Sequence, residues 1–270
     1  MEQTAINRPE AKTMLGKSFK IAAIGAAICL ISSIFDIIMS VKETDSLTTL
    51  SEVSMIIGLI LWGIGLIGAG NTLCRMGHLE TGVRSAGGAL ILWAIISIVS
   101  MFVIKEDTDP VSAKFLIWEG LWLIGPAIFY FSLKQEKNKE DKFFDTAAMG
   151  IGTAAVCEIL LVAAILLAMS AMEGHGVSMK SRGEYIEVSY SKGFAVGKWI
   201  AENYKLVTIV LSSVSTLGYL MAFGSMCSHN DFINDLKEEK AEEEVKELIN
   251  EVVSDYKSKK AAETANAKED

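Results

Sequence analysis

Histidine is scarce in this sequence, and the residue patterns of common enzyme sites are missing. The three histidines are His78, His175 and His229. There is no HExxH, no GxSxG and no glycine-rich phosphate loop, the patterns that mark a zinc site, a serine nucleophile or a nucleotide site. We therefore predict that the protein is not an enzyme. An intramembrane enzyme built on a pair of acids is the alternative that these absences leave open.

Cysteines are few and spread singly. They are Cys29, Cys74, Cys157 and Cys227, with no CxxC pair among them. Zinc sites and disulfide scaffolds need paired or clustered cysteines, so the sequence predicts neither, and it calls for no cofactor and no metal. Asn-x-Ser/Thr sequences are also absent, which fits a protein of the bacterial inner membrane.

Basic charge is too sparse to form a nucleic-acid-binding face. The net charge is -8, and most of it is local. Residues 231–270 hold thirteen Asp and Glu against seven Lys, which leaves about -2 for the rest of the chain. Nucleic-acid binding needs a concentrated basic surface, so we predict no nucleic acid partner.

Long apolar runs, by contrast, are plentiful. Hydrophobic residues make up 51% of the chain, and they gather into six runs of about the 20 residues that a membrane-spanning helix needs. The expected spans are residues 18–41, 52–73, 85–104, 112–133, 146–172 and 199–226. We therefore predict an all-α, six-helix membrane bundle with the lipid bilayer as its partner. The first run lacks a small-residue cleavage pattern, so it is expected to stay as a span rather than leave as a signal peptide.

Lysine and arginine in the short connections predict the orientation. Cytoplasmic loops of membrane proteins carry an excess of these residues. Ten lie on one side of the predicted bundle, at Arg8, Lys12, Lys17, Lys20, Arg75, Arg84, Lys134, Lys137, Lys139 and Lys142. The short loops of the other side hold Lys42, Lys105 and Lys114. Both termini are therefore expected in the cytoplasm, with the spans forming three in-out-in hairpins.

This topology divides the chain into three parts. Residues 1–17 form a cytoplasmic N-terminal segment, 18–227 a transmembrane domain, and 228–270 an acidic cytoplasmic tail. The longest outer connection, residues 173–198, is expected to hold a small outer domain, because residues 185–190 alternate with the period of a strand. Pro126 lacks a backbone N–H and crowds the carbonyl of Trp122, which predicts a kink in the fourth span.

Polar residues within the spans are the candidate site. Cys29, Ser32, Ser33, Asp36 and Ser40 recur at helical spacing and so share one face of the first span. Asp36 is either an ion or proton ligand or, as we favour, an acid held by hydrogen bonds from Ser32 or Ser33. The sixth span carries a similar face, which we call the hydroxyl face: Tyr204, Thr208, Ser212, Ser215 and Tyr219.

Two further acids lie inside spans, where an ionisable group is costly and often functional. Glu119 is expected in the outer half of the fourth span, satisfied by water or by Lys114. Glu158 lies near the middle of the fifth span, without a basic residue at its depth. It is either a group that acts in transport or a neutral acid hydrogen-bonded between helices. The hydroxyl face is its candidate neighbour.

The tail has an apolar stripe that predicts an amphipathic helix over residues 231–257. A partner helix or self-association is the favoured use of this stripe, as in a short coiled coil, and a solvated extension is the alternative. Two functions remain open. The favoured one is a non-enzymatic assembly or accessory protein that recruits a partner through its tail. The other is a channel or transporter for a small ion, proton or solute that uses the intramembrane acids.

Overall fold

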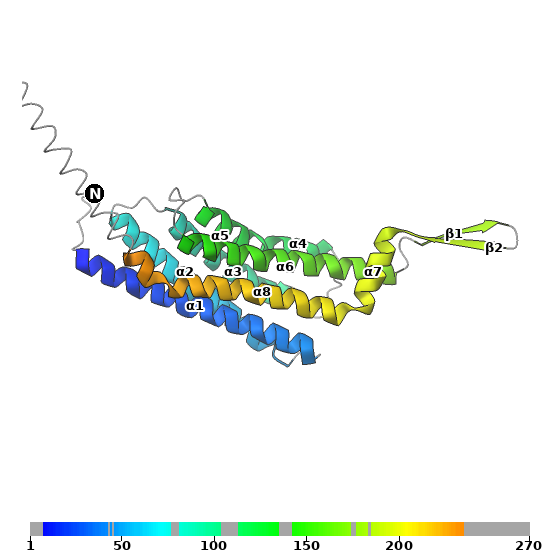
Figure 1. Cartoon of the computed structure of the whole chain (residues 1–270), viewed down its shortest axis with the longest axis horizontal. Helices are drawn as coiled ribbons and strands as arrows, with labels where there is room; N and C mark the ends of the chain where they lie inside the picture. The colour runs from blue at the N-terminus through cyan, green and yellow to red at the C-terminus, as the bar shows by residue number, and fades with distance from the viewer. Residues whose placement is uncertain are drawn as a thin grey trace, which may run out of the picture. The chain divides into compact units, whose positions relative to one another are not determined.

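The computed structural model describes residues 8–42, 44, 46–76, 81–103, 113–134, 142–173, 177–182 and 185–234. These residues are almost entirely helical (Figure 1). The elements are α1 (Arg8–Lys42), α2 (Thr48–Arg75), α3 (Thr81–Val103), α4 (Ala113–Trp122), α5 (Ile124–Lys134), α6 (Lys142–Met172), β1 (Val177–Arg182), β2 (Tyr185–Tyr190), α7 (Lys192–Glu202) and α8 (Tyr204–Cys227). The chain divides into two compact units, Met1–Ser228 and His229–Asp270. All of these elements belong to the first.

Within the described residues, five helices are long and apolar enough to cross a membrane. They are α1, α2, α3, α6 and α8, the last continuing to Asn234. The fourth predicted span, residues 112–133, is present as the two shorter helices α4 and α5. The chain is thus built as an integral membrane protein, with the fourth expected span broken in two. The sixth expected span, 199–226, is also interrupted: residues 199–202 end α7, and the long helix α8 begins at Tyr204.

The break lies at Leu123, between the end of α4 and the start of α5. Pro126 cannot donate a hydrogen bond to the carbonyl of Trp122, four residues earlier, and its ring crowds that carbonyl. The regular ladder resumes when the amide of Ala127 donates to the carbonyl of Leu123, at 3.1 Å. The predicted kink is therefore confirmed, and it is strong enough to interrupt the helix.

The first helix begins earlier than its apolar run. It starts at Arg8, inside the segment 1–17 that the sequence placed before the first span. Ala11, Leu15 and Phe19 recur every four residues and are almost completely buried. Residues with this spacing share one helical face. Tertiary packing of that face therefore extends α1 beyond the stretch that hydropathy marks.

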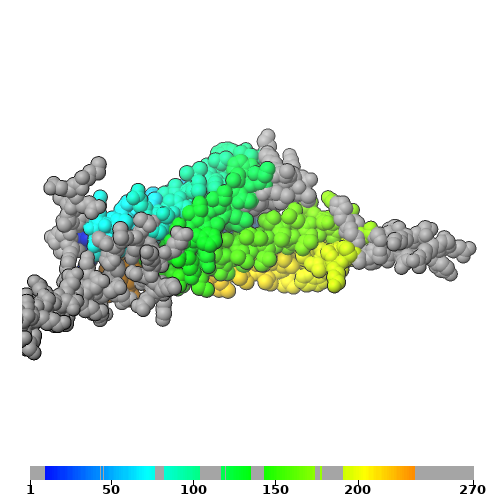
Figure 2. Space-filling view, turned by 90° about the horizontal axis from the view of Figure 1, so that it is seen from above, coloured from blue at the N-terminus to red at the C-terminus, as the bar shows by residue number. Residues whose placement is uncertain are grey.

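The helices close into a ring. Each one packs against the next in the order α1, α2, α3, α5, α6 and α8, and α8 packs back on α1. Figure 1 shows the long helices lying side by side, and Figure 2 shows α6 and α8 running together towards α7. Consecutive helices in such a ring enclose an interior, and this interior holds the candidate site.

One half of the bundle is tightly packed. We call it the packed half: the part of the ring that contains the N-terminal portion of α1 and the C-terminal portions of α2 and α8. There, glycines let the backbones approach closely, as small residues do in membrane helices. A Cβ on Gly25 would lie 2.2 Å from the backbone nitrogen of Trp62, and one on Gly150 would lie 2.4 Å from the carbonyl oxygen of Gly218. Large side chains, including Phe19, Trp62 and Phe129, are fully buried.

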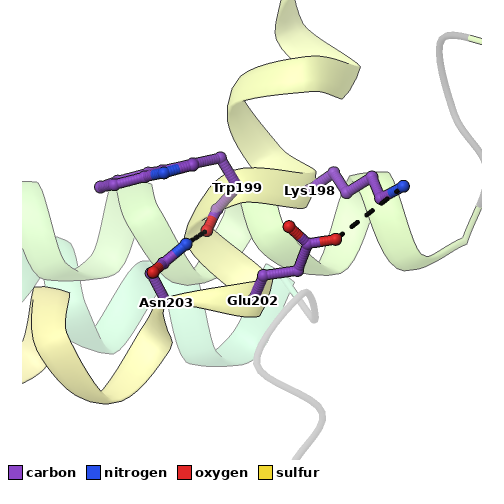
Figure 3. A network of polar contacts seen from close by, with 4 residues as sticks. All are labelled: Lys198, Trp199, Glu202 and Asn203. Atoms are coloured by element: carbon purple, nitrogen blue, oxygen red, sulfur yellow. Dashed lines mark hydrogen bonds and ion pairs between the residues drawn. The ribbon is translucent and has the colours of Figure 1, made fainter.

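The connection between α6 and α7 holds an antiparallel strand pair, in which Val177 pairs with Tyr190 and Arg182 with Tyr185. The predicted strand at 185–190 is confirmed. Helix α7 then packs on α6, and Asn203 marks the corner into α8 (Figure 3). Its side-chain amide donates to the carbonyl of Trp199 at 2.9 Å.

Figure 3 also shows the ion pair between Lys198 and Glu202, 3.8 Å apart on the exposed side of α7. The predicted tail helix, residues 231–257, lies outside the described residues except for 231–234, which are helical.

Candidate functional site

A single cavity of about 840 Å³ gathers polar side chains from α1, α2, α3, α4, α6 and α8. Most of the residues that the sequence singled out line it: Ser32, Ser33, Asp36, Glu158, Ser212 and Tyr219. The remaining lining residues are Met39, Ser40, Thr44, Thr48, Ser51, Glu52, Met55, Ile56, Ser97, Ser100, Met101, Trp122, Leu161, Tyr204, Lys205, Thr208 and Ser215. The ring of helices therefore encloses a space with a hydroxyl-rich and acidic wall.

The cavity occupies the half of the bundle opposite the packed half. Its lining begins where α1 and α3 end and where α2 and α8 begin, at Ser40, Met101, Thr48 and Tyr204. Several of these rim residues are exposed, so the cavity reaches the surface at that end. Along α8 the lining extends to Tyr219, about 22 Å at the helical rise. The cavity therefore runs from one end of the bundle to its middle.

The α1 wall is fixed by hydrogen bonds to α2. The hydroxyl of Ser51 donates to a carboxylate oxygen of Asp36 at 2.6 Å, and the hydroxyl of Ser32 donates to the carbonyl of Ser51 at 2.8 Å. Ser32 and Ser51 are buried. The sequence correctly placed Ser32, Ser33 and Asp36 on an inward face. It was wrong about the partner of Asp36, which is Ser51 of the next helix rather than Ser32 or Ser33.

Ser33 is bound instead within its own helix, where its hydroxyl donates to the carbonyl of Leu30 at 2.9 Å. A serine one turn from an acid can satisfy itself locally in this way, since a helical side chain reaches the carbonyl three or four residues earlier. The carbonyl of Ser33 accepts a hydrogen bond from Thr216 of α8 at 3.3 Å. Ser33 therefore helps to join the first and last helices of the ring.

The hydroxyl face of α8 forms the opposite wall. Its five residues all line the cavity. Tyr219, at the deep end, is buried and lies within electrostatic range of both Asp36 and Glu158. Glu158 itself lies halfway along α6 and is half-buried. The structure thus brings together Asp36, Glu158 and the hydroxyl face, which are far apart in the sequence.

One predicted residue is not placed. Glu119 belongs to α4, but its side chain lies outside the described part of the structure.

Sequence reasoning missed several lining residues: Ser51, Glu52, Ser97, Ser100 and Lys205. Ser51 and Glu52 had a detectable signal. They open the helix that follows α1 after a short turn, and two antiparallel helices joined in this way set their facing ends side by side. Ser97 and Ser100 had none, because nothing in the sequence shows which α3 face meets the interior.

Two of the lining residues carry hydroxyl groups that are not hydrogen-bonded within the described structure. The oxygens of Ser97, on α3, and Thr208, on α8, are buried and make no hydrogen bond to any described residue. Buried polar groups are nearly always hydrogen-bonded. The described residues therefore leave the hydrogen-bonding capacity of these two hydroxyls unused.

Among the residues that the structure describes, no group of three or more His, Cys, Asp and Glu side chains is arranged to hold a metal ion.

Comparison of the chain with protein-family models, with curated proteins and with solved structures gives no match. The cavity and its lining are therefore the basis for inferring what the protein does.

Proposed function

We propose that this integral membrane protein is a transporter that binds a small ion or polar solute in the cavity. In this proposal α4 and α5 together make a sixth crossing, so that both termini lie in the cytoplasm and the cavity opens outward, in a bacterial inner membrane. The connection with β1 and β2 is then a small outer domain. Trp199, which is 54% exposed on α7, suits the outer membrane interface, where tryptophan is enriched.

One observation carries the proposal. Asp36, Glu158 and the hydroxyl face line one cavity rather than separate dry contacts. Ionisable groups within spans are rare, and they mark ion and substrate pathways when they face a common interior. The volume of the cavity, about 840 Å³, lies in the range of pockets that hold small molecules.

The uneven packing of the bundle supports a transporter over an open channel. The cavity reaches the surface at one end, whereas the packed half fills the other with close backbones and large side chains. Alternating access needs one open and one closed side, exchanged by movement of helices against each other.

The assembly or accessory role ranks second. It rests on the amphipathic stripe of residues 231–257, most of which lies outside the described residues, whereas the cavity is formed by described side chains.

The test is transport by the full chain in liposomes. Charge movement and uptake are measured for protons, alkali cations, amines, amino acids and sugars, with protein-free liposomes as background. We expect a flux that Glu158→Gln reduces and Glu202→Gln, at an acid on the exposed side of α7, leaves unchanged. No flux for any of these solutes would count against transport. A flux equal in wild type and Glu158→Gln would remove Glu158 from the mechanism.

A further inference from the structure

The cavity wall holds more acidic than basic side chains. Three acids line it, Asp36, Glu52 and Glu158, against one lysine, Lys205. Asp36 and Glu52 lie within electrostatic range of each other. Among the described residues no lysine or arginine forms an ion pair with either of them. Clefts lined by one sign of charge between low-dielectric walls concentrate ions of the opposite sign, so this lining favours a cation.

The same wall is too large and too apolar for a bare ion. Beside the acids and hydroxyls it presents Met39, Met55, Met101, Leu161 and Ile56. Flexible methionine side chains adapt to ligand surfaces of varied shape. A bare metal ion is also disfavoured, since the acids do not gather into a coordination group in the described part of the chain. A cation attached to an apolar body accounts for both the acids and the apolar side chains of the wall.

An aromatic ring completes this surface. Trp122, the last residue of α4, lines the cavity. It is held edge-to-face against the buried Trp93 of α3, with ring centroids 4.7 Å apart. Tryptophan is the best aromatic partner for a cation. The break after Trp122, caused by Pro126, ends α4 at this ring.

We propose that the cavity binds a small organic amine as its ammonium ion, between Asp36 and Glu158, with the apolar part against the methionines and Trp122. This inference rests on the proposed function and names the class of solute. The hydrogen bond from Ser51 holds the Asp36 carboxylate at the cavity wall formed by α1 and α2. Tyr219 is buried and lines the same cavity as both acids, at its deep end.

The experiment measures binding to the purified full chain in detergent by calorimetry, with three probes of one shape and different charge. Phenethylamine is cationic at neutral pH, phenethyl alcohol is neutral, and phenylacetate is anionic. We expect phenethylamine to bind and the other two to bind at least about tenfold more weakly, as loss of a desolvated charge contact predicts. Equal or tighter binding of the alcohol or of phenylacetate would overturn the inference, as would no binding of phenethylamine.

Matched variants locate the site. Asp36→Asn and Glu158→Gln keep the shape of each side chain and are each expected to weaken phenethylamine binding about tenfold or more. Glu52→Gln, at an exposed position of the cavity rim, should weaken it less. Glu202→Gln should leave it unchanged. Binding that none of the three cavity variants alters would overturn the inference.

The two proposals fail in different ways. If the liposomes transport a neutral or anionic solute while phenethylamine does not bind, the amine inference is wrong and transport stands. If phenethylamine binds as expected but no amine or ion crosses the membrane, the amine site stands and the protein is a binding protein rather than a transporter.

Discussion

Gly25→Ala tests whether the packed half is as tight as its geometry indicates. The added Cβ would lie 2.2 Å from the backbone nitrogen of Trp62 and 2.6 Å from the carbonyl oxygen of Gly58. Neither atom belongs to a side chain that can rotate away. Relief therefore requires α1 and α2 to separate until the nearest contact reaches at least the 3.4 Å of ordinary van der Waals distance.

The size of the effect follows from two opposing terms. Overpacking in a well-filled interior costs about 1–3 kcal/mol, and a clash with rigid backbone belongs near the upper end. Alanine regains about 1 kcal/mol relative to glycine in a helix interior. The free energy of unfolding should therefore fall by about 1–2 kcal/mol. Each kcal/mol corresponds to about 2–4 °C in Tm for a chain of this size.

The control is Gly88→Ala on α3, where the added Cβ meets no atom within 4 Å. Only the helix-propensity gain applies there, so Tm should stay the same or rise. The assay is loss of the monodisperse chromatographic peak after heating in detergent. Equal Tm values for Gly25→Ala and Gly88→Ala would refute the close contact between α1 and α2.

Two other substitutions test local contacts by the same thermal assay. Ser51→Ala removes the donor to Asp36 and should lower the free energy of unfolding by about 1 kcal/mol, the typical contribution of an interhelical hydrogen bond in a membrane. Its control is Ser54→Ala, outside the cavity lining, and equal effects of the two substitutions would contradict the role of the bond. Gly197→Ala would set a Cβ 2.2 Å from the carbonyl oxygen of Leu167. It should therefore push α7 away from α6 and lower Tm by several degrees, at about 2–4 °C per kcal/mol. An unchanged Tm would show that α7 is only loosely attached.

Much of the helical framework could be predicted because hydropathy and helical periodicity are properties of short stretches of the sequence. The lengths of the apolar runs predicted the five long helices, and Pro126 predicted a kink in the fourth span, where the structure has the break between α4 and α5. The spacing of Ser32, Ser33 and Asp36 predicted an inward face, since residues three or four apart share one side of a helix.

The contacts between helices could not be predicted in the same way. Helical period identifies a face but not the neighbour that meets it, which is why the donor to Asp36 was sought on its own helix and was found at Ser51 of α2. The early start of α1 at Arg8 also escaped detection, because burial of Leu15 by other helices extends it. The cavity itself is a property of the ring, and no single helix specifies it.

Thiol labelling from each side of the membrane tests the central claim, that the cavity opens at one end of the bundle only. Cys74, Cys157 and Cys227 are replaced by alanine, which leaves the fully buried Cys29 as the internal control. Ser212→Cys is then added in the cavity lining. In the proposed orientation, the end of the bundle where α1 ends and α2 begins faces outward, so a membrane-impermeant thiol reagent should modify Ser212→Cys from outside and not from the cytoplasm. The parent variant, which keeps only Cys29, should stay unmodified from either side. Protection of Ser212→Cys from both sides, or its modification from both sides, would contradict a single opening, and modification from the cytoplasm only would contradict the proposed orientation.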